Sequence, residues 1–235
     1  MTATLQGISS MATRQVLGEL AQAWERQAGI PVAIESVGGV DAARRVAAGE
    51  SFDFAVLASD ALDKLVAGGH VLAGSRVDIV DSGVAIAVRS GSRQPDVSSE
   101  EALRSAVLAA DTVGYSTGPS GVALVKLFER WGIAQDLQGR LVQAPPGVPV
   151  GSLVARGEVA LGFQQLSELI HLQGIAILGM PAAVQITTTF AGGVCKTSPQ
   201  PERVRELLAF MASPAAEEAK RRNGMEPARP QGRPE

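Results

Sequence analysis

The chain has 235 residues, of which 46% are hydrophobic and 19% are charged, and its formal net charge is −3. This composition is typical of a globular protein with one large domain or two lobes, and the weak negative charge excludes a general attraction to nucleic acid or anionic membranes. The single cysteine, Cys195, excludes a disulfide framework, and the two histidines, His70 and His171, leave almost no material for a metal site. We therefore expect no metal and no cofactor.

The first 70 residues alternate between predicted strands and predicted helices. Each strand leads into a helix, and the strands are predicted at 3–8, 31–37 and 54–58. Ser9 and Ser10 begin the first helix, the Gly38-Gly39 turn precedes the second, and Ser59 begins the third. This order predicts an open parallel sheet with helices on its faces.

Two long runs with strand character, 77–89 and 184–194, flank a second α/β unit. The run at 77–89 is too long for one ordinary strand. The elements predicted between the runs are strands at 106–110, 141–143, 159–163 and 175–178 and helices at 119–130, 152–156 and 167–171. A last helix is predicted from Pro201 to Asn223, and the Pro- and Arg-rich residues from Glu226 on are predicted to be disordered.

The two long strands predict an α/β fold of two Rossmann-like lobes joined by two crossover strands. Lobe 1 is expected at 1–81 and 192–225, lobe 2 at 82–191, and a disordered tail at 226–235. Such a molecule usually binds its ligand in a cleft between the lobes, which closes by a hinge motion. A single doubly wound domain is the alternative, but two lobes of about a hundred residues fit ordinary domain sizes better.

The stretch 112–121 predicts an anion-binding turn. It holds the hydroxyls of Ser116, Thr117 and Ser120, and Pro119 stands near the first position of the helix that follows. Backbone N–H groups and the positive end of the helix dipole meet at such a helix start, which suits an anion. An ordinary capped helix is the competing interpretation.

Seven short motifs follow one another along nearly the whole chain: 7–10, 29–32, 37–39, 53–59, 82–88, 157–162 and 207–214. Their order resembles that of the periplasmic molybdate-binding proteins, which belong to the type 2 periplasmic solute-binding superfamily. The resemblance implies the two-lobed fold, a small anionic ligand and an ABC permease as partner. It implies a monomer in the periplasm. The scattered basic residues and the few aromatic residues predict no nucleic-acid partner.

The resemblance also assigns ligand donors position by position. These are Ser10 with Ser9, Ser59, the turn from Ser116 through Ser120 to Gly121, and the Val148-Pro149 turn. Two further candidates come from their chemistry. The Arg14 guanidinium matches a carboxylate, and the Tyr115 phenol can donate a hydrogen bond.

Two positions depart from the molybdate binders. After Gly39, Val40 stands where those proteins carry a serine, and Gln164 stands where they carry a tyrosine. The loss of two hydroxyls argues against a compact oxyanion. The longer Gln164 amide both donates and accepts hydrogen bonds, which suits a carboxylate or a hydroxylated organic acid.

The segment 162–168, together with the fold, also resembles the aconitate isomerases. The resemblance implies an enzyme that shifts a proton across an allylic system next to carboxylates. Such chemistry needs donors that hold carboxylates, and it needs one base, for which Asp41 and Tyr115 are the candidates.

Three functions stay open at this point: a receptor for an organic (poly)carboxylate, an aconitate isomerase-like enzyme, and a molybdate or tungstate receptor. The location stays open as well, because the N-terminus shows no signal-peptide pattern. The protein is either periplasmic, with its signal peptide absent from this chain, or cytoplasmic.

Overall fold

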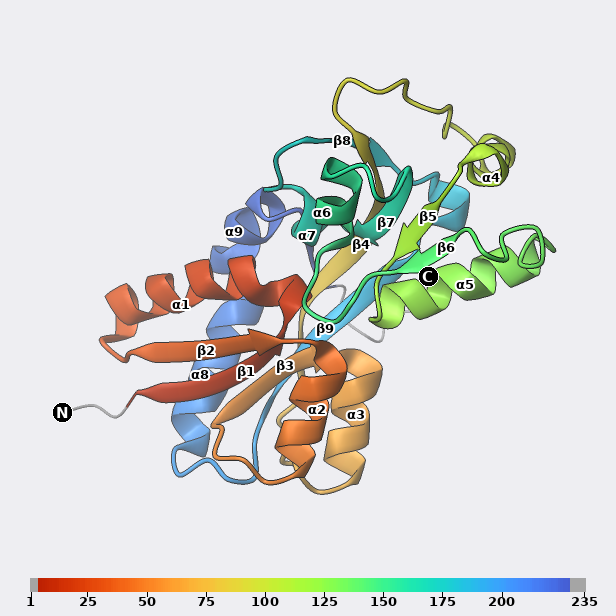
Figure 1. Ribbon diagram of the computed structural model, residues 1–235. Coiled ribbons are helices and arrows are strands. Elements are labelled where there is room, and N and C mark those ends of the chain that lie inside the picture. The colour runs from red at the N-terminus through yellow and green to blue at the C-terminus, as the bar shows by residue number, and fades with distance from the viewer. Residues whose placement is uncertain (1–3, 229–235) are drawn as a thin grey trace. The chain divides into compact units, whose positions relative to one another are not determined.

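The computed structural model describes residues 4–228, which divide into two compact units (Figure 1). Unit 1 comprises the described residues up to Ser82 and from Thr188 on, and unit 2 comprises Gly83–Thr187. The chain passes between the units twice, within β4 (Val77–Arg89) and at the start of β9 (Thr187–Val194). Among residues 4–228, no helix has both the length and the apolar character that a membrane crossing requires.

Unit 1 is built on a sheet in which β1 (Leu5–Ser10) lies between β2 (Val32–Val37) and β3 (Phe54–Ala58), with all three strands parallel. β9 runs antiparallel to β3, and the short β10 (Glu226–Pro227) runs antiparallel to β4. The helices of this unit are α1 (Arg14–Ala28), α2 (Gly39–Ala47), α3 (Ser59–Ala67), α8 (Pro201–Ala212) and α9 (Glu217–Arg222).

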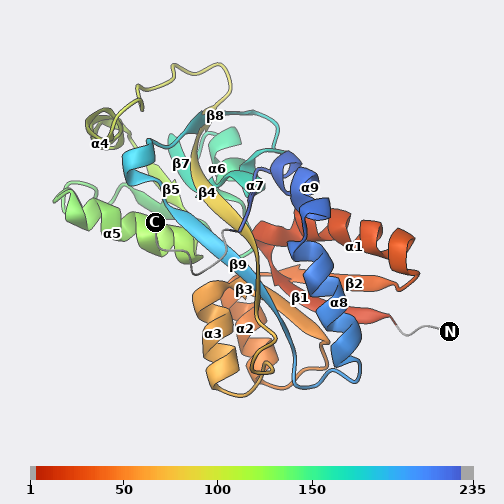
Figure 2. The same ribbon diagram turned by 180° about the vertical axis from the view of Figure 1, so that it is seen from behind.

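Both faces of the unit 1 sheet are covered, because successive residues of a strand point to opposite sides. Phe54 and Val56 of β3 pack in the cluster that includes α1 and α8, whereas Ala55 and Leu57 pack with α2 and α3. Figure 2 shows α8 lying across its face of the sheet. All five residues of β3 are buried, which explains why its sequence is continuously apolar.

In unit 2, β5 (Val113–Tyr115) lies parallel to β6 (Leu141–Gln143) and to β7 (Leu161–Gln165). β4 pairs antiparallel with β7 and with β8 (Ile175–Gly179). The helices are α4 (Glu100–Ala109), α5 (Pro119–Arg130), α6 (Val150–Ala155) and α7 (Leu166–Leu169). Helices α4 and α5 pack on one face of the sheet, and α6 and α7 pack on the other.

Two predicted strands have a different structure. The apolar run 106–110 predicts a strand, but it lies mainly at the end of helix α4, where Leu103 and Val107 face the core one turn apart. Short apolar runs fit a buried helix and a buried strand equally well. The run 184–194 is a strand only from Thr187 on, after a 3₁₀ helix at Ala182–Val184. The run at 77–89, by contrast, forms one continuous strand of 13 residues.

Three chain segments also differ from the prediction. Ser9 and Ser10 end β1 rather than begin a helix, and a 3₁₀ turn at Met11–Thr13 precedes α1. The helix predicted from Pro201 breaks near Pro214, because proline cannot continue a helix. Glu226–Pro227 forms β10, so disorder is the wrong prediction for these two residues. Ala3 and residues 229–235 lie outside the described part of the chain.

Candidate functional site

The parallel strands of unit 1 bring three helix starts to one edge of the sheet. Ser10 ends β1, Gly39 begins α2 after β2, and Ser59 begins α3 after β3. Because parallel strands end at the same edge, the groups that follow them are neighbours. A Cβ built on Gly39 would lie 3.6 Å from the Ser10 hydroxyl oxygen.

The two serines at the end of β1 differ in what their hydroxyls do. Ser9 is fully buried, and its Oγ lies 2.8 Å from the Oγ of Ser36 on β2. Ser10 is half-buried and its carbonyl accepts from the Thr13 hydroxyl at 3.0 Å, but its own Oγ has no hydrogen bond within the described residues. The Ser10 hydroxyl is therefore free to donate to a ligand, whereas the Ser9 hydroxyl serves the sheet.

The other candidates in unit 1 offer different chemistry. The Ser59 hydroxyl donates to the Thr189 carbonyl at 3.0 Å. Val40 is 77% exposed and offers no hydrogen-bonding group except its backbone. Arg14 is exposed at the first position of α1 and forms no ion pair with any residue in 4–228, whereas Asp41 is paired with Arg44.

In unit 2, the turn between β5 and α5 holds two hydroxyls side by side. The Oγ atoms of Ser116 and Ser120 lie 3.3 Å apart, and Ser120 is buried. Gly121 is required there, because a Cβ at that position would lie 1.9 Å from the Ser116 carbonyl oxygen. Tyr115 precedes the turn and is half-buried, with no hydrogen bond from its phenol within the described chain.

The end of β7 places Gln164 among polar groups. Gln164 is 3% exposed, and its Oε1 accepts a hydrogen bond from the backbone N–H of Gly151 at 3.4 Å. Gly151 lies in the first turn of α6, two residues after Pro149, and both Val148 and Pro149 are half-buried. Because β5 and β7 are parallel, Gln164 near the end of β7 and the Ser116 turn after β5 lie at the same edge of the unit 2 sheet.

Glu168 is a polar residue of this region that sequence reasoning did not single out as a candidate. It is half-buried in α7, the short helix that begins directly after β7. Burial raises the pKa of the Glu168 carboxyl to about 7, and the Gln164 side chain opposes this rise only in part. The only signal in the sequence is the four-residue spacing from Gln164, which by itself predicts no contact across a strand end.

Two polar side chains that precede Glu168 in the sequence are buried and lack a partner within the described residues. The Oε1 of Gln165 and the Oγ of Ser167 have no hydrogen bond within the described residues, although these residues are only 2% and 5% exposed. Buried polar atoms normally find a partner, so such atoms mark places where a water or a ligand can bind. Among residues 4–228, no group of three or more His, Cys, Asp or Glu side chains is arranged to hold a metal ion.

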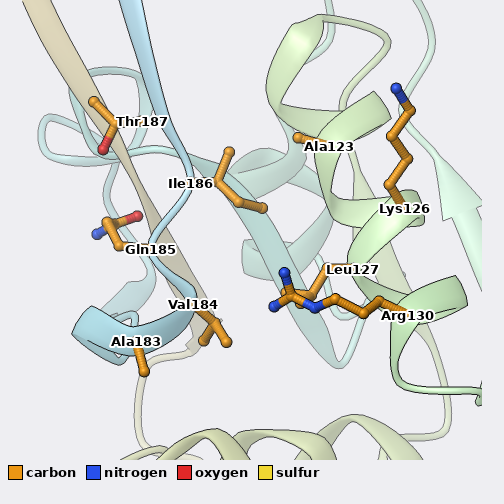
Figure 3. Close-up of a pocket in the computed structure, with 9 residues that line it drawn as sticks. All are labelled: Ala123, Lys126, Leu127, Arg130, Ala183, Val184, Gln185, Ile186 and Thr187. Carbon is orange, nitrogen blue, oxygen red and sulfur yellow. The ribbon is translucent and has the colours of Figure 1, made fainter.

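A separate pocket of about 490 Å³ lies in unit 2, between the last turns of α5 and the segment 183–187 (Figure 3). Its wall combines the apolar Leu127, Val184 and Ile186 with the polar Gln185 and Thr187. Figure 3 shows the Arg130 guanidinium reaching toward Val184, while the Lys126 ammonium points away. None of the candidate residues lines this pocket, so it is distinct from the donors at the strand ends.

Comparison with known proteins identifies the family. A family model described as bacterial extracellular solute-binding protein matches residues 5–226. The chain belongs to this family. The matched residues span both units of the chain.

A curated relative, an aconitate isomerase from a Pseudomonas species, is 38% identical over 231 residues, covering 95% of this chain and 88% of the relative. Among solved structures, the periplasmic molybdate-binding protein of Azotobacter vinelandii has a TM-score of 0.80 at 20% identity, with 97% of this chain and 100% of that chain covered. The sulfate-binding protein of Mycobacterium tuberculosis has a TM-score of 0.79 at 16% identity, with 98% and 88% covered. The prediction of a type 2 periplasmic binding protein fold is confirmed.

Proposed function

We propose that this protein binds an unsaturated tricarboxylate and isomerises it, as the name of its aconitate isomerase relative describes. The observation that carries the proposal is the 38% identity to that relative over 95% of the chain. A match of this extent includes both units and therefore the donors at both sets of strand ends. The molybdate- and sulfate-binding neighbours, at 20% identity or less, support the fold alone.

The candidate residues suit several carboxylates better than one compact oxyanion. The Arg14 guanidinium has no ion-pair partner in residues 4–228 and can hold a carboxylate through two parallel hydrogen bonds. The Ser10 hydroxyl and the Ser116–Ser120 pair supply donors for other carboxylates. Val40 supplies no hydroxyl, and the Ser9 hydroxyl is engaged with Ser36, so unit 1 offers fewer hydroxyls to molybdate than the resemblance implied.

A second candidate function is binding without chemistry. The family model is that of extracellular solute-binding proteins, which supports a receptor that captures an organic acid and delivers it to an ABC permease. In either case we propose a monomer that works in the periplasm. The enzyme and the receptor differ in one respect, which is whether a proton-accepting group reaches a carbon atom of the bound ligand.

Calorimetry and thermal unfolding with a panel of anions test the ligand. The panel contains molybdate, tungstate, sulfate, phosphate, citrate, cis-aconitate and trans-aconitate. A ligand present at 100 times its Kd stabilises the folded state by about 2.7 kcal/mol, which shifts the unfolding midpoint measurably. The proposal predicts shifts with the aconitates and none with molybdate, followed by conversion of one aconitate isomer into the other. A shift with molybdate alone would contradict it.

A further inference from the structure

The pocket in Figure 3 lies between two elements that are each held in place. On one side is α5, whose Leu127 is buried in the core of unit 2. On the other side, the segment 183–187 is fixed to β4. The Val84 N–H of that strand donates to the Ile186 carbonyl at 2.9 Å and to the Gln185 Oε1 at 3.1 Å. The pocket of about 490 Å³ is therefore preformed, and its size is typical of small-molecule sites.

The lining of this pocket combines apolar surface with positive charge. Leu127, Val184 and Ile186 supply the larger apolar side chains, and the first two are buried. Lys126 and Arg130 lie one turn apart on α5, and none of the described lining residues is acidic. A molecule that suits this lining has an apolar body and a negative charge.

The Arg130 guanidinium has most of its hydrogen-bonding capacity unused. Its ion pair in residues 4–228 joins its Nη2 to the Oε1 of Glu100 at 3.8 Å, which is too long for a hydrogen bond. The same Glu100 oxygen accepts a hydrogen bond from the Trp131 indole at 2.6 Å. Figure 3 shows the guanidinium reaching toward Val184, on the opposite side of the pocket. Its N–H donors can therefore hold a carboxylate through two parallel hydrogen bonds.

A purely structural role explains the position of Arg130 less well. It is the last residue of α5, and a cation there complements the negative end of the helix dipole. That role is fulfilled equally well by a guanidinium that extends into solvent. It does not require a preformed pocket with apolar side chains in front of the cation.

We propose that this pocket binds a small molecule in which one carboxylate is joined to an apolar body, as in an aromatic carboxylate. Arg130 binds the carboxylate, and Leu127, Val184 and Ile186 contact the apolar body. None of the donors at the strand ends lines the pocket. The inference therefore goes beyond the proposed function and does not depend on it.

The test uses 1-naphthoate as the probe, because it joins one carboxylate to an apolar double ring. Acetate carries the charge without the rings, and 1-naphthalenemethanol carries the rings without the charge, so both serve as control compounds. Each compound is titrated into the full chain and followed by ¹H–¹⁵N NMR, which gives the Kd and the backbone amides whose signals shift. A second titration of 1-naphthoate contains saturating trans-aconitate.

Two variants change the pocket, and each has a matched control. Arg130→Gln removes the cation, and Arg104→Gln removes an exposed arginine of α4 in the same unit. Ala183→Asp places an acid in the lining, and Ala182→Asp places one at an exposed neighbour outside it. Thermal unfolding shows that each variant is folded.

We expect 1-naphthoate to saturate the wild type with a Kd of about 1 mM or tighter, and to shift the amides of 126–130 and 183–187. Arg130→Gln should weaken binding about tenfold, and Ala183→Asp at least about threefold, because each removes or opposes the charge-assisted contact. The two control variants should match the wild type, and trans-aconitate should not displace the probe.

Three results would overturn the proposal. They are the lack of saturation at about 10 mM 1-naphthoate, equally tight binding of the neutral alcohol, and shifts confined to the turn 116–121. Equal loss of affinity in Arg130→Gln and Arg104→Gln would overturn the role of Arg130. Each of these readings is independent of whether the protein binds or converts aconitate.

Discussion

The carbonyl oxygen of Ser116 fills the space in which Gly121 would carry a side chain. A Cβ at Gly121 would lie 1.9 Å from that oxygen and 3.2 Å from the Tyr115 ring. The first turn of α5 therefore closes tightly on the end of β5. This close approach brings the hydroxyls of Ser116 and Ser120 to 3.3 Å from each other.

Gly121→Ala should destabilise the protein and weaken anion binding, because the obstacle is backbone rather than a movable side chain. Overpacking typically costs about 1–3 kcal/mol, and we expect at least about 2 kcal/mol here. Gly118→Ala is the matched control, since a Cβ there meets only the Ser116 Oγ, at 3.8 Å. Its cost should stay within about 1 kcal/mol. Urea unfolding measures the free energy of unfolding of both variants. An equal decrease in the two variants would contradict the role given to the Ser116 carbonyl.

Ser9→Ala should affect mainly stability, whereas Ser10→Ala should affect mainly ligand binding. Ser9 exchanges a hydrogen bond with Ser36 in the core, so its loss should lower the free energy of unfolding by about 1 kcal/mol and leave ligand affinity nearly unchanged. Ser10 has a hydroxyl without an internal partner in residues 4–228, so its loss should weaken ligand binding with little effect on stability. Calorimetry and urea unfolding separate the two. A larger loss of affinity in Ser9→Ala would contradict this assignment.

Restoring the two missing hydroxyls should shift ligand preference toward molybdate. The double variant Val40→Ser, Gln164→Tyr supplies them at the positions where the sequence departs from the molybdate binders. A hydrogen bond to a charged group is worth about 1.5–3 kcal/mol, so molybdate affinity should rise at least about tenfold. Val122→Ser, at another exposed valine, serves as the control. Unchanged molybdate affinity in the double variant would show that these positions do not set the ligand.

Lys220 should be a source of instability. It is fully buried in α9, its Nζ has no hydrogen bond within the described residues, and burial lowers its pKa. Lys220→Met should raise the free energy of unfolding by about 1–3 kcal/mol at pH 7. Because the folded state binds this proton less tightly than the unfolded state, the wild type regains stability as pH rises toward 10.5. The gain from methionine should therefore shrink between pH 7 and pH 10, and a gain that does not depend on pH would contradict this explanation.

Much of the fold follows from local patterns in the sequence. The continuous apolar run 54–58 predicts β3 with its bounds, and Ser59 correctly marks the start of α3. The run 106–110 misleads, since its apolar residues fit a helix face as well as a strand, and the true strand has only the three residues Val113–Tyr115. Short central strands carry too few residues for a period to show.

The candidate site was predictable only where a donor follows a strand directly. The Ser9 hydroxyl is bonded and the Ser10 hydroxyl is not, because the strand register places Ser9 opposite Ser36. Two adjacent serines in the sequence do not reveal this register. The raised pKa of Glu168 depends on the burial of its carboxyl in α7, which begins at Leu166 directly after β7. Both depend on how the unit packs, so the residue pattern at 162–168 does not predict them.

The most direct test of the central claim is to incubate the purified protein, in catalytic amount, with pure trans-aconitate and follow the reaction by ¹H NMR in deuterated buffer. If the protein is an isomerase, cis-aconitate appears until the two isomers reach a constant ratio, and deuterium enters the methylene group. Trans-aconitate that stays unchanged and undeuterated, while calorimetry shows saturable binding, would contradict the isomerase and leave a receptor.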